Sequence, residues 1–266
     1  MEQIPRHFYR YRSLAGNASE YVRKTIQENE IYFAKPSSFN DPFDCCPTFD
    51  FNASDNEIID YFVHILRRNS PQLSEEELNS EAHVIAMLHD TEKSIRNPSN
   101  QLHIQQLHTK NITEKVGALC MATTNKDVLM WSHYADYHRG IVLCFDGCLD
   151  FFKNTHRVNY APKRPIINPF RDSSELMMEA ALLTKAKHWK YEKEWRLIRY
   201  EGGSGKAILP STALTGVILG SRISPEDEEK VVSWVQSRRV SIEILRASQS
   251  LTNYSLSIAK TSSIGH

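Results

Sequence analysis

Apolar and polar side chains alternate at the period of a β-strand in several separated stretches of the chain. In residues 141–146, Ile141 and Leu143 fall on one face, and Val142 and Cys144 fall on the other. Similar stretches predict strands at 8–12, 31–34, 119–123, 192–198, 215–220 and 240–246. The chain therefore predicts a mixed sheet built from parts that are distant in sequence.

Other stretches have the three- and four-residue spacing of an amphipathic helix. Residues 19–29 and 174–187 place apolar side chains on one side at this spacing. Ser224 followed by Pro225 predicts a helix start, because serine caps the first turn and proline fits the first helical position. By contrast, residues 151–171 contain three prolines and little periodicity, which predicts a surface loop.

A long run of helix-forming residues without a strand pattern covers 55–116. Ser54 with Glu57, and Ser74 with Glu77, match the capping box, in which a hydroxyl and a carboxylate satisfy backbone N–H groups at a helix start. The expected fold class is α+β, with a mixed central sheet and an inserted helical lobe. The expected organisation is a single domain over 1–266, a helical insertion at 55–116 and a C-terminal scaffold at 211–266.

Composition narrows the classes of function. The 266 residues carry 32 Lys and Arg against 32 Asp and Glu, so the zero net charge gives no general attraction to nucleic acid or to an anionic membrane. No run approaches roughly eighteen apolar residues and no signal-like segment opens the chain, so we expect a cytoplasmic protein without membrane contact. Five cysteines without zinc-site spacing predict free, buried thiols and no metal site.

The connection between the strands at 119–123 and 141–146 is the most chemically varied part of the chain. It contains Trp131, Ser132, His133, Tyr134, Tyr137, His138 and Arg139. A purely structural connection is usually short and rich in Gly, Pro, Asn or Asp. Two interpretations stay open: a functional site, or a capping turn that buries Trp131 and satisfies His133 locally.

Residues 35–44 form a second polar connection. Asn40, Asp41 and Asp44 lie beside two prolines and suit hydrogen bonds to the backbone of a loop. This pattern fits either a rigid loop or one wall of a site.

The strand predicted at 192–198 would place Glu192 and Glu194 on one face, where two carboxylates repel each other. Either a substrate or cation compensates this repulsion in a site, or neighbouring cations do so in an edge strand. The neighbouring cations are Lys190, Lys193 and Arg196.

Four motifs in order resemble the signature of a widespread bacterial family known as a domain of unknown function. They are YRYRS (9–13), IYFAKPSSFNDPFD (31–44), LMWSHYADYHRGI (129–141) and HWKYEKEWRLI (188–198). Members of that family often lie near phage-defence and mobile-element genes. The resemblance therefore implies a bacterial defence or toxin-type effector, and it names no reaction.

More distantly, the order of groups resembles the ADP-ribosyltransferase superfamily. Its split β-sandwich holds NAD between an early arginine or histidine, a central Ser/Thr or Tyr strand, and a late catalytic glutamate. The matching positions are Arg10 or Arg12, then Thr123 with Thr124, then the Glu192–Glu194 stretch. The chain departs from that family in lacking a Ser-Thr-Ser motif and in carrying a large helical lobe.

This second resemblance implies a transferase that uses NAD as a substrate and passes ADP-ribose to a protein or nucleic-acid acceptor. Glu194, Glu192 and His133 would be catalytic, with a carboxylate stabilising the oxocarbenium-like transition state. A guanidinium fork would hold the pyrophosphate and aromatic rings would stack on the bases. The implied cofactor-binding residues are Arg10, Arg12, Tyr32, Asn40, Asp41, Thr123, Trp131 and Tyr134.

Two spatial expectations and two rival functions follow. We expect Arg10 or Arg12 to point into one cleft with Glu192 and Glu194. We also expect Trp131, His133 and Tyr134 to lie within contact distance of the 39–44 loop and to form one wall of a shared cleft with it. One rival is a metal-dependent nuclease, and the other is a non-catalytic module that binds a phage or host component. The ligands of the nuclease would be Asp41, Asp44, Glu192 and Glu194.

Overall fold

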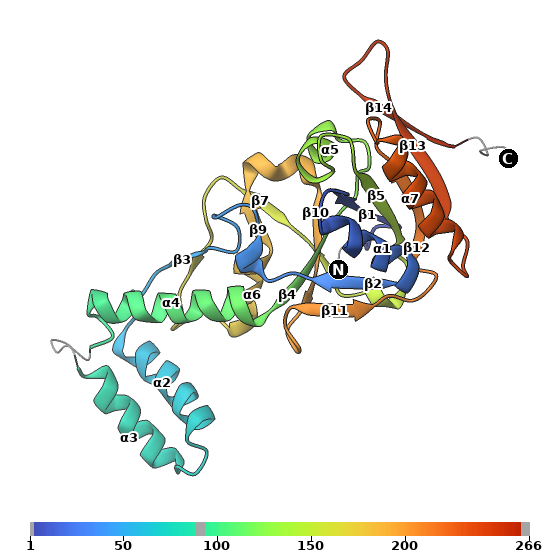
Figure 1. Ribbon diagram of the computed structural model, residues 1–266. Coiled ribbons are helices and arrows are strands. Elements are labelled where there is room, and N and C mark those ends of the chain that lie inside the picture. Colours follow the sequence, from blue (N-terminus) through green and yellow to red (C-terminus); the bar gives the residue numbers. More distant parts are fainter. Residues whose placement is uncertain (1–2, 89–93, 262–266) are drawn as a thin grey trace. The chain divides into compact units, whose positions relative to one another are not determined.

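The alternating stretches form an eight-stranded mixed sheet in the computed structural model (Figure 1), which describes residues 3–88 and 94–261. The strand order is β14-β13-β12-β5-β1-β4-β10-β6, and every neighbouring pair is antiparallel except β12 with β13. The strands are β1 (His7–Arg12), β4 (Gly117–Ala122), β5 (Ile141–Asp146), β6 (Thr155–Arg157), β10 (Glu194–Arg199), β12 (Leu214–Leu219), β13 (Glu243–Gln249) and β14 (Leu256–Lys260). The expected α+β class with a mixed central sheet is confirmed.

Contacts within the chain define two compact units. The first unit comprises Met1–Lys35, Val116–Tyr160 and Lys187–His266, and the second comprises Pro36–Lys115 and Ala161–Ala186. The central sheet belongs to the first unit. Whether both units fold as one domain stays a prediction. Residues 89–93 of the expected helical insertion and 262–266 of the expected C-terminal scaffold lie outside the described residues.

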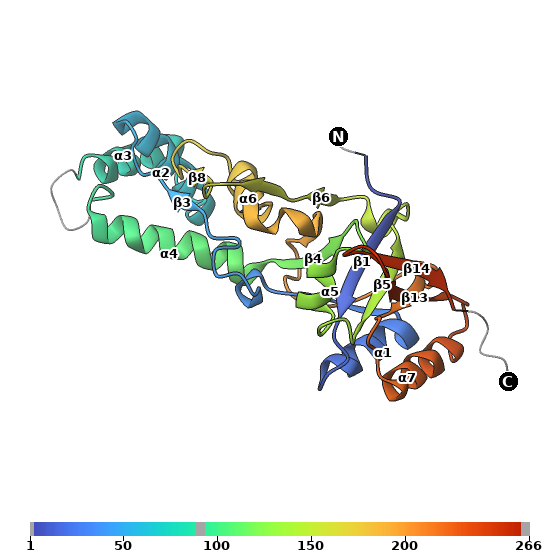
Figure 2. The same ribbon diagram turned by 90° about the horizontal axis from the view of Figure 1, so that it is seen from above.

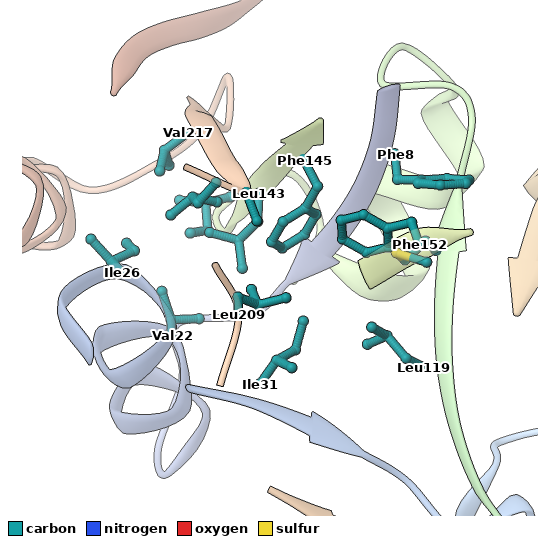
Figure 3. Packing of buried hydrophobic residues seen from close by; sticks show 14 of the residues in the cluster. Phe8, Val22, Ile26, Ile31, Leu119, Leu143, Phe145, Phe152, Leu209 and Val217 are labelled. Atoms are coloured by element: carbon teal, nitrogen blue, oxygen red, sulfur yellow. The ribbon is translucent and has the colours of Figure 1, made fainter. Parts of the chain in front are cut away.

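Helices α1 (Ala18–Glu28) and α7 (Pro225–Gln236) pack on one face of the sheet, here called the α1/α7 face (Figure 2). They contribute Val22, Ile26, Val231 and Val235 to a large apolar cluster with the strands. Figure 3 shows Phe8, Phe145 and Phe152 from this cluster, with Phe8 and Phe152 ring centroids 5.6 Å apart. Burying each such ring stabilises the fold by about 1.5–3 kcal/mol.

Helix α5 (Val128–Tyr134) packs on the opposite face, here called the α5 face. A second apolar cluster forms there, and it joins Met130 and Trp131 of the helix to Tyr11, Val142 and other strand residues. Because side chains alternate along β1, Tyr11 packs in the core on the α5 face, and the sheet separates this core from the one on the α1/α7 face.

A second, two-stranded sheet covers part of the α1/α7 face. It pairs β2 (Glu30–Phe33) with β11 (Gly205–Ile208), and a single bridge from Ala34 to Ala118 connects it to β4. Ile31 and Phe33 of β2 are buried in the large apolar cluster. The α1/α7 face is thus covered by these two helices and, in part, by the small sheet.

The second unit is mainly helical. It contains η1 (Pro36–Ser38), β3 (Thr48–Phe49), α2 (Asp55–Asn69), α3 (Glu75–Ala86), α4 (Pro98–Lys115), β8 (Ile166–Ile167), α6 (Ser174–Leu182) and β9 (Thr184–Ala186). Both predicted capping boxes form, since Ser54 and Ser74 each exchange hydrogen bonds with the glutamate three residues later. Residues 55–88 and 94–116, the described part of the expected helical insertion, contain helices and no strand.

Several predicted element boundaries are wrong. Residues 151–171, predicted as a loop, contain short strands, and the helix predicted to reach 187 ends at Leu182. The strands there are β6, β7 (Asn159–Ala161) and β8, preceded by η2 (Asp150–Phe152). Each is only two or three residues long, so its pairing is set by a distant partner rather than by a local alternating pattern.

Among the described residues, no helix is long and apolar enough to cross a membrane. All five cysteines are free, as expected, but the expectation that they are buried is correct only for Cys45 and Cys144.

Alkylation should distinguish two of these cysteines. Cys144 is buried in β5, and burial together with the charge of Glu243 raises the pKa of its thiol to about 12. Cys148 is exposed. Because the thiolate is the reactive form, iodoacetamide at neutral pH should label Cys148 in the native protein and leave Cys144 unlabelled until the protein is unfolded. Peptide mass spectrometry reads both sites, and fast native labelling of Cys144 would contradict the packing of β5.

Candidate active site

Two residues from different sequence motifs lie on either side of Ala122 in one row of the central sheet. Tyr9 in β1 and Glu194 in β10 both pair with Ala122, the last residue of β4. Directly paired residues of neighbouring strands project to the same side of a sheet. Tyr9 and Glu194 therefore lie on the α5 face, beneath the helix that carries the LMWSHYADYHRGI motif.

Helix α5 forms because Asp127 caps it. The Asp127 carboxylate accepts hydrogen bonds from the backbone N–H groups of Leu129 and Met130. Trp131 is fully buried, donates its indole N–H to the carbonyl of Asn125 at 2.8 Å, and meets the Tyr11 ring edge-on. The segment expected as a turn is thus a helix anchored by its tryptophan, and ligand stacking on Trp131 stays a prediction.

A left-handed turn follows α5. Asp136, Tyr137 and His138 all have positive φ angles, of 48°, 53° and 69°. Such a run is unfavourable for residues with a Cβ, and close backbone contacts hold it in place. A Cβ on Gly220 would lie 2.1 Å from the His138 carbonyl oxygen, so only glycine permits this contact. Burial and the nearby charge of Arg222 lower the pKa of His138.

Glu192 and Glu194 reach the α5 face by different routes. Glu192 ends the 3-10 helix η3 (Lys187–Glu192), and Glu194 begins β10. Lys193 between them has a φ of 46°, so the chain turns sharply there. The prediction that both glutamates alternate along one strand is therefore wrong, because the left-handed residue interrupts the strand. Both side chains are nevertheless buried, at 3% and 5% exposure.

Glu194 is engaged by the arginine two residues later. Its two carboxylate oxygens accept hydrogen bonds from Nε and Nη2 of Arg196 at 2.7 and 3.1 Å. Arg196 is 1% exposed, so this ion pair is among the most deeply buried polar contacts of the described chain. The backbone N–H of Glu194 also donates to the Tyr160 hydroxyl at 2.8 Å. The structure thus contains the neutralising contact with Arg196 that one of the two interpretations of the sequence expected.

The Tyr134 hydroxyl donates a 2.6 Å hydrogen bond to Glu192. This contact joins the two motifs that are 58 residues apart in sequence. Beside it, the rings of His133, Trp189 and Tyr191 lie 6.0–6.4 Å apart, centroid to centroid. His133 is exposed and the other two rings are half-buried. A buried carboxylate therefore lies next to an accessible aromatic surface.

Thr123 supports the turn between the glutamates. Its backbone N–H and its hydroxyl both donate to the carbonyl of Lys193, at 3.3 and 3.4 Å. Thr123, which follows the end of β4, therefore holds the carbonyl of Lys193, the residue of this turn whose backbone is strained.

Substitutions of Lys193 should reveal this strain. A residue with a Cβ in the left-handed region costs roughly 1–2 kcal/mol, and β-branching adds to the cost. We expect Lys193→Gly to be more stable than Lys193→Val by about 1 kcal/mol or more. Urea unfolding of both variants measures the difference. Equal stabilities would show that Lys193 does not hold the positive φ angle in solution.

Arg10 and Arg12 lie on the other side of the sheet. They pair with Leu143 and Ile141 of β5, which belong to the cluster on the α1/α7 face. The expectation that they share one cleft with the glutamates is wrong, because residue 9, not residue 10, aligns with Glu194. Arg10 donates a long 3.4 Å hydrogen bond to the Tyr32 carbonyl. Burial lowers the pKa of Arg10 and lowers that of Arg12 to about 10.

Asn40, Asp41 and Asp44 belong to the second unit. The Asp41 carboxylate accepts from the backbone N–H of Phe43 at 2.9 Å, and Asp44 forms a buried ion pair with Lys185 at 3.6 Å. These contacts fit the rigid-loop interpretation. A role of Asn40 or Asp41 in binding a ligand stays a prediction. Across the described residues, no group of three or more His, Cys, Asp or Glu side chains is arranged to hold a metal ion.

Sequence reasoning missed the contributions of Tyr160 and of the Trp189–Tyr191 ring pair. Tyr160 lies in the proline-rich stretch predicted as a loop, and no local pattern connects it to Glu194. The ring pair lies inside the HWKYEKEWRLI motif, so the motif itself was the available signal.

The comparison with known proteins covers the part of the chain that builds this site. No curated protein and no solved structure matches the chain significantly. A family model matches residues 130–197, which run from α5 through η3 into β10. Over that stretch, which includes Trp131, Glu192 and Arg196, the chain is similar to the family described as Protein of unknown function (DUF2971).

Proposed function

We propose that the protein cleaves the nicotinamide–ribose bond of NAD and transfers ADP-ribose to an acceptor. The observation that carries this proposal is the Glu192–Glu194 turn. It brings two buried carboxylates to the α5 face, one bonded to the Tyr134 hydroxyl and the other to Arg196. A fixed negative group in a site that excludes water is the environment that stabilises a developing oxocarbenium ion.

In the proposed reaction, the bond between ribose C1 and the nicotinamide nitrogen breaks. Its electron pair leaves with neutral nicotinamide, and C1 becomes positively charged. A hydroxyl or other nucleophile of the acceptor then bonds to C1, and its proton passes to a base. Glu192 is our choice for stabilising the cation, since the Tyr134 hydroxyl orients its carboxylate beside the aromatic rings. Exposed His133 is our choice for the base that takes the proton.

Aromatic contacts support the choice of NAD. The nicotinamide of NAD is a flat cation, and aromatic faces bind flat cations through stacking and cation–π attraction. Trp189, Tyr191 and His133 supply such faces beside Glu192. In this proposal Tyr134 orients the carboxylate through its hydrogen bond, rather than stacking on the ligand.

For the fold, we propose a relationship to the split β-sandwich of ADP-ribosyltransferases. The small β2–β11 sheet packing over one face of the central sheet supports this relationship. The resemblance of the motifs to a bacterial family near defence genes supports a toxin-type or antiviral role in the cytoplasm. A protein or a nucleic acid would be the acceptor.

Nicotinamide release tests the proposal. Purified protein is incubated with NAD, alone and with bacterial lysate, and nicotinamide is quantified by chromatography. Transfer of label from adenine-labelled NAD to protein or nucleic acid then identifies the acceptor class. Release above that of the Glu192→Gln variant supports the proposal, and its absence in both incubations overturns it.

A binding module is the second candidate. The observation favouring it is that Glu194 and Arg196 form a buried ion pair, as in an interaction that serves structure. In that case NAD is not consumed, and partner binding depends on exposed His133 and half-buried Trp189 rather than on the carboxylates.

A further inference from the structure

The central sheet ends at β14 (Figure 1), and no strand in residues 3–88 or 94–261 pairs with the outer side of β14. Two hydrogen bonds that flank this strand show which backbone groups face outward. The N–H of Ser250 donates to the Ser255 carbonyl at 3.0 Å. The N–H of Thr261 donates to the Ile244 carbonyl at 3.2 Å. Hydrogen-bonded pairs recur at every second residue of an antiparallel ladder, so the residues between them point their N–H and C=O groups away from β13. These outward residues are Leu256, Ile258 and Lys260.

β14 lacks the features that usually keep a sheet edge from pairing with another chain. Natural edge strands are short, or they carry charges, prolines or bulges. The other edge of this sheet, β6, follows the rule, because it has three residues and exposes His156 and Arg157. By contrast, β14 has five residues in continuous register with β13, and its only charge is Lys260 at the last position. The edge at β14 is therefore a template for a further strand.

The side chains of β14 carry the apolar core of the α5 face as far as this edge. Leu256 is buried in the same cluster as Trp131. Ile258 packs against that cluster and is only half-buried. The core therefore ends at Ile258, where a strand added to β14 would cover it.

The turn that connects β13 to β14, residues 250–255, is here called the hairpin tip (Figure 1). It leaves Leu251 and Tyr254 fully exposed, at 102% and 105%. The tip is nevertheless ordered, because the Ser250 hydroxyl accepts hydrogen bonds from the backbone N–H groups of Thr252 and Asn253. Large apolar side chains presented next to an open strand edge favour a protein interface.

Charge favours a second copy of this chain as the partner. Residues 247–259 contain no Asp, Glu, Lys or Arg, although these residues make up 24% of the chain. The hairpin therefore offers no charge that would select an oppositely charged protein, a nucleic acid or an anionic membrane. Two copies of an uncharged edge can meet without repulsion between like charges.

We propose that β14 pairs antiparallel with β14 of a second copy and joins two sheets into one. A two-fold axis at Ile258 aligns all the outward backbone groups, since Ile258 then faces itself and Leu256 faces Lys260. The α5-face cores of both copies meet across this axis. Each hairpin tip extends past Thr261 of the other copy, where its exposed side chains are buried. The interface lies towards the other end of the strand order from β10, so it goes beyond the proposed cleavage of NAD.

Sedimentation velocity of the full chain over a series of concentrations tests this interface. We expect a reversible change from the mass of one chain to the mass of two as the concentration rises. Ile258→Lys places two like charges opposite each other at the axis and should weaken self-association by about tenfold or more. Ile258→Glu should do the same. An equal mixture of the two variants brings opposite charges together and should restore the dimer, which neither a folding defect nor an asymmetric interface would do.

Two further variants locate the contact. Leu251→Ser combined with Tyr254→Ser changes only exposed side chains of the hairpin tip, so it should weaken the dimer and leave the thermal melt unchanged. His156→Lys changes the opposite edge, β6, and should leave the dimer intact. A parent that is monomeric at every concentration, a dimer retained in Ile258→Lys or in the tip variant, or no dimer in the mixture would each overturn the proposal. Binding of a monomeric parent to neutral phosphatidylcholine vesicles would overturn it in favour of a lipid surface.

Discussion

Replacing Glu194 by alanine is expected to lower the free energy of unfolding by about 3–5 kcal/mol, because it removes the carboxylate that pairs with the buried Arg196 guanidinium. Arg196 is 1% exposed and its Nε and Nη2 both donate to the Glu194 carboxylate. The loss should therefore come mainly from the reduced charge compensation of the buried guanidinium, not from a missing contact. Denaturant unfolding monitored by circular dichroism gives the free energies of the parent and the variant.

A double variant separates these two causes. In Glu194→Leu with Arg196→Met neither charge of the pair remains buried, so the stability should return to within about 1–2 kcal/mol of the parent or exceed it. The matched control is Lys230→Ala, which breaks an exposed ion pair with Asp227 and should cost less than about 1 kcal/mol. A Glu194→Ala variant as stable as Lys230→Ala would show that the buried pair does not form in solution.

Replacing Glu192 by glutamine is expected to slow nicotinamide release by roughly a hundredfold or more, if the protein cleaves NAD as proposed. The change removes the negative charge and keeps the shape, and the Tyr134 hydroxyl can still donate to the amide oxygen. Stability should change little compared with Glu194→Ala. Initial rates at saturating NAD, with thermal melts of the same preparations, measure both quantities.

Two further variants sharpen this test. Tyr134→Phe removes the donor to Glu192 and should lower the rate by about tenfold, the effect of one hydrogen bond to a charged group. Glu229→Gln changes an exposed glutamate of α7 and should leave the rate unchanged. A Glu192→Gln rate equal to that of Glu229→Gln would move the reaction away from this carboxylate, and the binding-module interpretation would then be preferred.

Patterns that depend on neighbouring residues were readable from the sequence by itself. The capping boxes at Ser54 and Ser74, the Ser224–Pro225 helix start and the alternation in 141–146 all correspond to observed elements. Each of these signals is local, because a cap or an alternating strand is defined within a few residues. The mixed sheet and the helical content of 55–116 follow from such signals.

The arrangement of the site was decided by tertiary structure. Arg10 and Glu194 lie on opposite faces because Ala122 pairs with Tyr9, and a shift of one residue in that register would have placed them together. Glu192 leaves the strand because Lys193 adopts a positive φ angle that Thr123 fixes from another strand. Register and long-range hydrogen bonds connect residues more than 50 positions apart, so the sequence names the groups while only the fold decides which of them meet.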